Sequence, residues 1–257
     1  MTRNLKAMGL ALVAVFALGA ISASSAMAEE TKPIAHFTAS EYPAKVTGSQ
    51  IGKAILVVGS LGESTCNKAH FHGELTKAAT SLTGTGTLEE CEMHTFLGQH
   101  RPVTVTTNGC TGTLTVHEKG TTDEDVTVET PDGTIHKHAT IHRWSGDSRL
   151  DCPEGVNGVE THAYKSGNTA HTELLCTYTL KPQTVKNIHF SVITVGGKST
   201  YMTVEAKEAE SKITRTSGTV LNCGGAEQTG KYTGVGTVEA LNEEGAMIEG
   251  GIDTVTT

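Results

Sequence analysis

The sequence predicts an all-β protein made of two sandwich-like or immunoglobulin-like β units, which are disulfide-linked and follow a cleaved signal peptide. Three observations support this prediction. Threonine alternates with apolar residues in short segments, turn-forming residues separate these segments, and the cysteine count of six is even. Alternation with a period of two residues is typical of strands with one face toward a core and one toward water.

The N-terminal segment has the three parts of a secretory signal. Arg3 and Lys6 precede an apolar run over 8–21, and small residues follow up to Ala28. The run has about 14 residues, whereas a membrane-spanning helix needs roughly 20. We therefore expect a mature chain that begins at Glu29, has no membrane span, and is secreted or held at the exterior of the cell envelope.

The charge of the mature chain argues against one class of partner. The full chain has a net charge of −8, and removal of the two basic signal residues makes it −10. Such a surface repels the phosphates of nucleic acids, so we expect no nucleic-acid partner. No other partner follows from the composition.

Strand-like alternation recurs along the mature chain. The segments that show it are 51–58, 69–76, 103–106, 114–116, 126–130, 134–143, 172–180, 186–195, 200–206, 213–221 and 231–240. Alanine, glutamate and lysine are frequent enough at 74–81 and 204–212 to predict one or two short helical turns there. Strands this short and numerous favour a sandwich-like arrangement.

The alternation is interrupted over 143–157, where glycine, proline and acidic residues cluster. We therefore expect a signal peptide at 1–28, an N-terminal β domain at 29–145 and a C-terminal β domain at 146–257. Three cysteines fall in each domain. If all six are paired, at least one disulfide must cross between the two domains.

An even number of cysteines in an exported chain predicts a disulfide framework, here of three bridges. The cysteines are Cys66, Cys91, Cys110, Cys152, Cys176 and Cys223. None has the Cys-x-x-Cys spacing of zinc ribbons or thioredoxin-type redox motifs. Their spacing leaves many pairings open. Because Cys152 and Cys176 flank a hairpin-like segment at 158–180, we expect these two to form a local pair.

Short motifs also connect the chain to other exported proteins. They are Phe37-Thr38, Glu41-Tyr42-Pro43-Ala44, Asn108-Gly109-Cys110, Cys152-Pro153-x-Gly155, Cys176 with Pro182-Gln183, and Cys223 with Gly230-x-Tyr232-x-Gly234. In these features the chain resembles a loose family of exported bacterial all-β proteins with spaced cysteines and no known activity. The resemblance implies the β architecture and no catalytic or ligand-binding residue.

Histidine is frequent, with 12 in the chain. Residues two apart in a strand share a face, and their side chains lie about 7 Å apart. Two sets would share a face each: His70, His72 and Glu74, and His136, His138, His142 and Trp144. The candidate metal ligands are therefore His70, His72, Glu74, His136 and His138, with Zn²⁺ or Cu²⁺ as the ion. The alternative is an outer face whose exposed imidazoles titrate near pH 6.5 without binding metal.

Hydrolase chemistry is a further alternative. Gly146-Asp147-Ser148 matches the opening motif of a serine-esterase family, but that family needs an α/β framework, so we interpret the motif as a turn between domains. Paired carboxylates for glycoside hydrolysis are also possible among 28 acidic residues. We favour a secreted, non-enzymatic β protein without a cofactor, structural or binding in role. An extracellular metal-binding protein and a secreted hydrolase are the alternatives.

Overall fold

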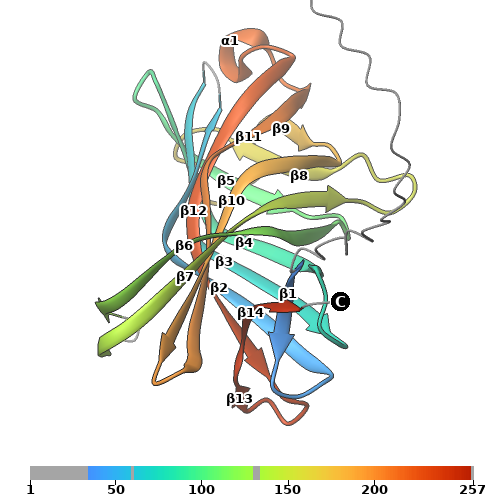
Figure 1. Cartoon of the computed structure of the whole chain (residues 1–257). Helices are drawn as coiled ribbons and strands as arrows, with labels where there is room; N and C mark the ends of the chain where they lie inside the picture. The colour runs from blue at the N-terminus through green and yellow to red at the C-terminus, as the bar shows by residue number, and fades with distance from the viewer. Residues whose placement is uncertain (1–33, 59–60, 130–133, 256–257) are drawn as a thin grey trace, which may run out of the picture. The chain divides into compact units, whose positions relative to one another are not determined.

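The computed structural model describes residues 34–58, 61–129 and 134–255, so the expected signal peptide and its cleavage site lie outside the described residues. The all-β prediction is confirmed (Figure 1). The elements are β1 (Ile34–Ala39), β2 (Ala44–Val58), β3 (Gly62–Leu75), β4 (Ser81–Thr95), β5 (His100–Thr106), β6 (Thr111–Glu129), β7 (Ile135–Asp151), β8 (Val159–Tyr164), β9 (Leu174–Leu180), β10 (Gln183–Val195), β11 (Lys198–Ser217), α1 (Val220–Cys223), β12 (Glu227–Leu241), β13 (Met247–Ile248) and β14 (Gly250–Val255). Within these ranges, no helix has the length and apolar character needed to cross a membrane.

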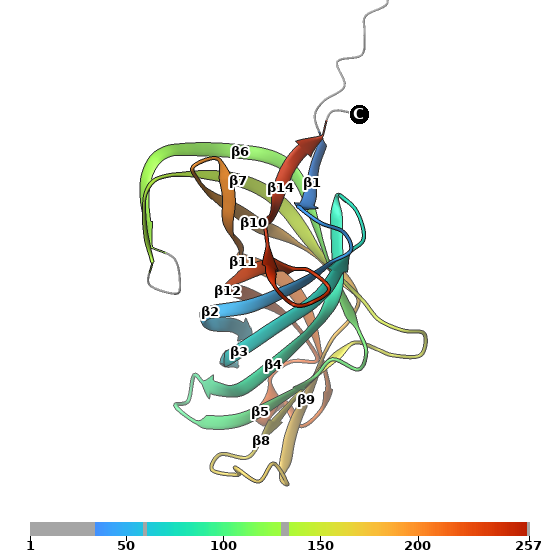
Figure 2. The ribbon, with the colours of Figure 1, turned by 90° about the horizontal axis from the view of Figure 1, so that it is seen from below.

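Twelve strands form one antiparallel sheet that closes on itself twice. Five long strands, β4, β3, β2, β12 and β11, are common to both closures. One ring is completed by β5, β8 and β9, and the other by β6, β7 and β10. In Figure 2, β6 and β7 lie on one side of the common strands, and β5 and β8 lie on the other.

The two rings separate because two of the long strands, β4 and β11, change partners along their length. In β4, residues 81–84 pair with β6, whereas residues 91–94 pair with β5. In β11, residues 198–206 pair with β10, whereas residues 213–217 pair with β9. Each half of β4 and of β11 therefore belongs mainly to one ring. The five common strands are part of both rings and connect them covalently.

Each ring has its own hydrophobic core. The core beside β6, β7 and β10 includes Phe37, Leu82, Trp144 and Phe190. The core beside β5, β8 and β9 includes Met93 and Tyr178 together with four buried cysteines. Aliphatic and small residues supply most of both cores, as the scarcity of aromatic residues in the sequence requires.

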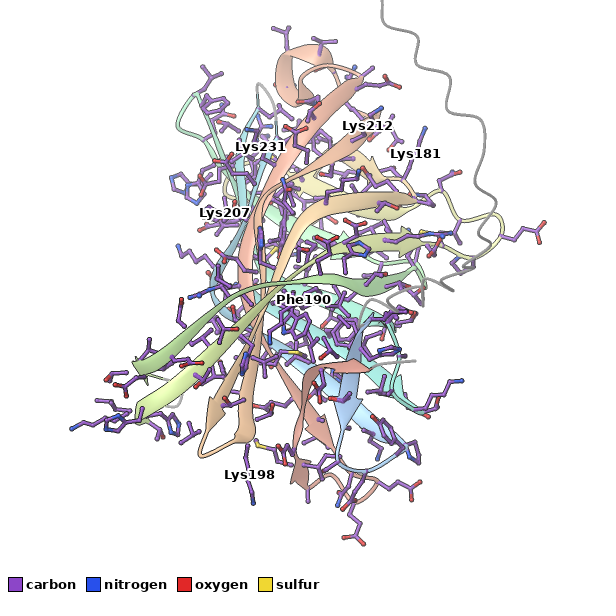
Figure 3. The ribbon with its side chains drawn as sticks, viewed as in Figure 1. Lys181, Phe190, Lys198, Lys207, Lys212 and Lys231 are labelled. Carbon is purple, nitrogen blue, oxygen red and sulfur yellow. A yellow bond between two sulfur atoms is a disulfide. The ribbon has the colours of Figure 1, made fainter. Side chains whose placement is uncertain are left out.

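A separate two-stranded sheet of β1 and β14 packs against the first of these cores. Phe37 of β1 meets Phe190 of β10 edge to face, with ring centroids 5.4 Å apart. In Figure 3, Phe190 lies among the side chains between the strands, whereas Lys198 projects from the turn that joins β10 to β11. The aromatic pair thus holds the small sheet on the large one.

The structure shows no division at the expected boundary between 145 and 146. The described residues belong to one compact unit, and β7 runs through the boundary from Ile135 to Asp151. The Gly146-Asp147-Ser148 motif is therefore part of a strand, and its interpretation as a turn was wrong. Gly146 is required there for another reason: a Cβ on it would lie 2.1 Å from the carbonyl oxygen of Thr115 on β6.

The two expected helical segments are absent from the described residues. Residues 204–212 lie within β11, where Ala206 and Ala209 are buried between β10 and β12. Strand pairing on both sides outweighs the helical preference of alanine, glutamate and lysine. The helical turn α1 instead lies at Val220–Cys223, which overlaps a segment expected to be a strand.

All six cysteines are paired, as expected for an oxidising compartment. The bridges are Cys66–Cys91, Cys110–Cys152 and Cys176–Cys223. The expected local pair of Cys152 with Cys176 was therefore wrong. Thr111 at the start of β6 is the cross-strand partner of Asp151 at the end of β7. This register places Cys152, the next residue, beside Cys110. The Cys110–Cys152 bridge crosses position 145, as the parity of the cysteine count requires.

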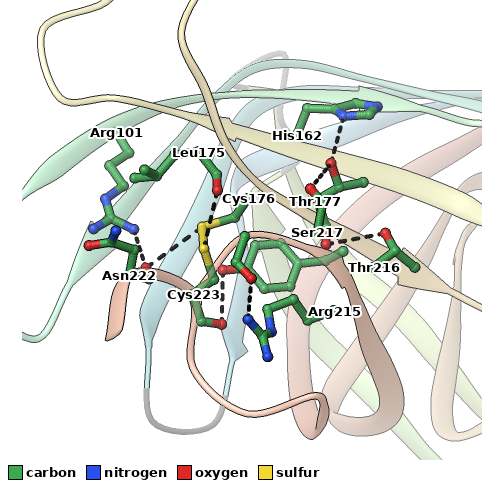
Figure 4. Close-up of a disulfide and its surroundings, with 12 residues drawn as sticks. Arg101, His162, Leu175, Cys176, Thr177, Arg215, Thr216, Ser217, Asn222 and Cys223 are labelled. Atoms are coloured by element: carbon green, nitrogen blue, oxygen red, sulfur yellow. Dashed lines mark hydrogen bonds between the residues drawn. A yellow bond between two sulfur atoms is a disulfide. The ribbon is translucent and has the colours of Figure 1, made fainter. Parts of the chain in front are cut away.

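The bridge from Cys176 to Cys223 joins β9 to α1 (Figure 4). The carbonyl oxygen of Asn222 accepts a hydrogen bond of 2.6 Å from Nη1 of Arg101, which ties α1 to β5 as well. Gly218 makes room for this arrangement: its φ is +96°, and a Cβ there would lie 2.3 Å from the sulfur of Cys223. The segment that follows β11 is thereby fastened to two strands of one ring.

Candidate functional site

An apolar cavity of about 420 Å³ lies where the two rings meet. The common strands contribute Leu56, Val204 and Tyr232 to its wall. The strands of one ring contribute Val105 and Leu180, and those of the other contribute Leu114 and Ile188. The volume is within the range of about 300–1,000 Å³ that is usual for small-molecule sites. The lining predicts an apolar occupant.

The cavity exists because the residues around it are too small to fill the space between the cores. Of the larger side chains in its wall, Phe71 packs over two glycines: its ring lies 3.2 Å from where a Cβ would stand on Gly73, and its own Cβ lies 3.2 Å from the same position on Gly48. Tyr232 similarly covers Gly234, with its hydroxyl 2.9 Å from the Cβ position. Several aliphatic residues of the wall are only partly buried, including Leu56, Leu88 and Leu114. Interior space therefore remains beside them.

Gln50 is a polar group in this apolar wall with unused hydrogen-bonding capacity. Its Nε2 donates a hydrogen bond of 2.8 Å to the carbonyl oxygen of Cys66 and another to that of Gly52. Because both partners are acceptors, the amide nitrogen must face them. The buried Oε1 has no hydrogen-bond partner. A ligand with a hydroxyl or N–H donor would satisfy this oxygen.

Tyr178 and Tyr232 also line the cavity. Burial raises the pKa of Tyr178 to about 12, although the guanidinium groups of Arg101 and Arg215 act in the opposite direction. Burial likewise raises the pKa of Tyr232. The hydroxyl of Tyr178 donates a hydrogen bond of 3.3 Å to the carbonyl oxygen of Cys223. Both phenols are thus neutral at physiological pH, and neither contributes a charge to the cavity.

The histidines expected on β3 are divided by the structure. His70 lines the cavity, and its Nδ1 lies 3.4 Å from Oγ of Ser49. His72 and Glu74 are exposed. Of the residues between and after them, Leu75 is buried and Phe71 lies in the cavity wall together with His70. The proposal that His70, His72 and Glu74 share one metal ion remains a prediction.

The set on β7 is also arranged differently from the expectation. His138 has a positive φ of 58°, and its exposed side chain is hydrogen-bonded through Nδ1 to the carboxylate of Asp125. Trp144 is buried in a core instead of sharing an exposed face. His142 is partly buried beside it, and its pKa is lowered by this burial and by the nearby Lys119. A role of His136 with His138 in metal binding stays a prediction.

One group that the sequence analysis did not identify brings three metal-ligating side chains together. Glu92, His94 and His100 each offer one ligand atom, and these atoms lie within 4.8 Å of one another. Nε2 of His94 is 3.0 Å from Oε1 of Glu92, and this hydrogen bond is the main reason that the pKa of Glu92 is below its ordinary value. No other group of three such residues meets this distance within 34–58, 61–129 and 134–255.

A sequence signal for this group was present. Glu92 and His94 are two apart, and Thr95–Gln99 carries turn residues before His100. Read as a hairpin, this stretch places His94 opposite His100, which is their observed pairing. A pattern within one strand does not reveal the group, because His100 lies on the strand next to that of Glu92 and His94.

Comparisons with known proteins identify no relative of this chain. No family model matches it. No curated protein and no solved structure matches it either. The cavity and the Glu92, His94 and His100 group are therefore the features from which a function can be inferred.

Proposed function

We propose that this protein is an exported, non-enzymatic binding protein that holds a small apolar molecule in the cavity between its two rings. The observation that carries the proposal is the cavity of about 420 Å³ with its mainly aliphatic wall. Removing a ligand's apolar surface from water contributes about 25 cal/mol per Å². An interior site of this kind provides affinity without any catalytic group.

The proposed location outside the cytoplasm is consistent with the three disulfides. It also follows from the signal-like N-terminal segment. An apolar molecule has low solubility in the water of that compartment. Enclosure in a protein with a net negative surface would keep such a molecule dispersed, and this is the role that we assign.

A fluorescence titration with the apolar probe N-phenylnaphthylamine tests the proposal. We expect saturable binding with a stoichiometry of one probe per chain. In the variant Leu56→Trp, the larger side chain fills part of the cavity and should weaken binding at least tenfold. The matched control is Ile55→Trp, because the neighbouring side chain on β2 points to the opposite face and does not line the cavity. Equal affinity in the two variants would contradict the proposal.

The cavity also predicts how affinity depends on ligand length. Primary alcohols of increasing chain length should displace the probe about fourfold better per added methylene, which corresponds to about 0.8 kcal/mol each. The increase should stop when the cavity is full. An alcohol should bind about fivefold tighter than the alkane of equal length, because its hydroxyl can donate to Oε1 of Gln50. Gln50→Met should remove the difference between alcohol and alkane; retention of the full difference would exclude Gln50 as the acceptor.

A further inference from the structure

The hairpin formed by β4 and β5 places two histidines and a glutamate on one face. His94 and His100 are direct partners across the two strands, with imidazole centroids 4.2 Å apart. Glu92 stands two residues before His94 on the same strand and therefore on the same face. Met93 between them is 1 % exposed and lines the cavity. The three side chains thus occupy the outer face of β4 and β5, opposite the cavity.

We propose that Glu92, His94 and His100 form a binding site for one Zn²⁺ ion. Two imidazole nitrogens and one carboxylate oxygen are a ligand set that zinc accepts, with a water molecule in the fourth position. Calcium and magnesium prefer sites built from oxygen alone. This site is independent of the proposed apolar ligand, because none of its three residues lines the cavity.

The observed distances allow this coordination after small side-chain rotations. Ligand atoms around a tetrahedral zinc ion lie about 3.4 Å apart. Oε1 of Glu92 and Nε2 of His94 are already 3.0 Å apart, and all three ligand atoms are within 4.8 Å of one another. Zinc would replace the hydrogen bond between Glu92 and His94, so two polar groups that now satisfy each other would both bind the ion.

The backbone that carries these residues is fixed on its inner side. The Cys66–Cys91 disulfide connects β3 to β4 immediately before Glu92. Gly62 on β3 packs so closely on β4 that a Cβ would lie 2.0 Å from the carbonyl oxygen of His94. A rigid strand pair limits the entropy lost on binding, which favours a preorganised site.

Charged residues near this site have opposing effects on the binding of a cation. Glu63 on β3 is the direct cross-strand partner of His94 and is exposed, so its carboxylate adds negative charge near the ion. Lys53 is close enough to Glu92 to influence its ionisation and opposes a divalent cation. The carboxylates of Glu92 and Glu63 together outnumber the single ammonium group of Lys53, so the local charge is negative and favours a cation.

Isothermal titration of the full chain, disulfides intact, with ZnCl₂ at pH 7.5 tests this site. We expect one zinc ion per chain to bind at micromolar concentrations. His94→Gln and His100→Gln should each abolish the binding heat, and Glu92→Gln should reduce it. These positions are exposed or partly exposed, and a circular dichroism spectrum equal to that of the parent confirms folding of each variant.

Two matched controls separate this site from the other histidines. His72→Gln and the double variant His136→Gln with His138→Gln remove exposed or partly exposed imidazoles of the two sets predicted from the sequence. If Glu92, His94 and His100 hold the zinc ion, both variants should bind zinc as the parent does. In the parent, zinc should also shift the imidazole NMR signals of His94 and His100. The proposal is overturned if the parent binds no zinc, or if His94→Gln binds zinc as the parent does.

Discussion

Replacing Cys176 and Cys223 together with alanine is expected to lower the free energy of unfolding by about 4 kcal/mol. The bridge spans 47 residues, and the entropy of closing a loop of this length in the unfolded chain accounts for that value. Both cysteines are fully buried in a core, so the loss of the sulfur atoms adds a packing cost. The bridge also holds α1, whose Asn222 binds Arg101.

Equilibrium unfolding in guanidinium chloride measures this loss. The comparison variant replaces Cys66 and Cys91, whose shorter separation of 25 residues predicts about 3.5 kcal/mol from loop closure. We therefore expect the Cys176 and Cys223 variant to be the less stable of the two. A loss below about 1 kcal/mol would show that the β9–α1 connection contributes little to stability.

Phe190→Ala is expected to destabilise the protein by about 3–5 kcal/mol, the usual cost of removing a buried phenylalanine ring. Phe190 is 0 % exposed, and its ring is the contact through which Phe37 holds β1 and β14 on the large sheet. The matched control is Phe96→Ala, because Phe96 lies 69 % exposed at the turn between β4 and β5. That control should change stability by about 0.5 kcal/mol or less.

Both phenylalanine variants can be measured by the same guanidinium unfolding experiment. Hydrogen exchange adds a more specific readout, because amides of β1 and β14 should lose protection in Phe190→Ala before those of the five common strands. Uniform loss of protection throughout the chain would mean that the small sheet is not held mainly by this aromatic contact.

Local patterns in the sequence were sufficient to identify most strands. The alternation over 186–195 and 231–240 falls within β10 and β12, where polar and apolar side chains face opposite sides. The pairing partners of the strands could not be predicted in this way. Period-two alternation specifies which face of a strand is apolar, but it carries no information about the neighbour at each edge. The change of partner along β4, from β6 to β5, is therefore invisible in the sequence.

The same reason explains why the predicted cysteine pair was wrong and why the Glu92, His94 and His100 group was not predicted. Cys66 and Cys91 are direct neighbours on β3 and β4, and only the register of those strands brings them together. His94 and His100 likewise meet across a hairpin, so their proximity depends on the register of β4 and β5. A His-x-His pair within one strand can be recognised without knowing any register. The cavity is harder still to predict, because it results from side chains that are too small rather than from a motif.

The strands common to both rings limit how this protein can be divided into fragments. A chain cut at 145 would end within β7, and its first part would lack β11 and β12. Both rings would then remain open, and the edges of β2 and β5, which have lost β12 and β8, would present unpaired backbone groups to other molecules. Exposed edges of this kind promote aggregation by strand addition. Expression of either half alone should therefore yield insoluble material, and any transfer of a ring to another scaffold must carry all five common strands with it.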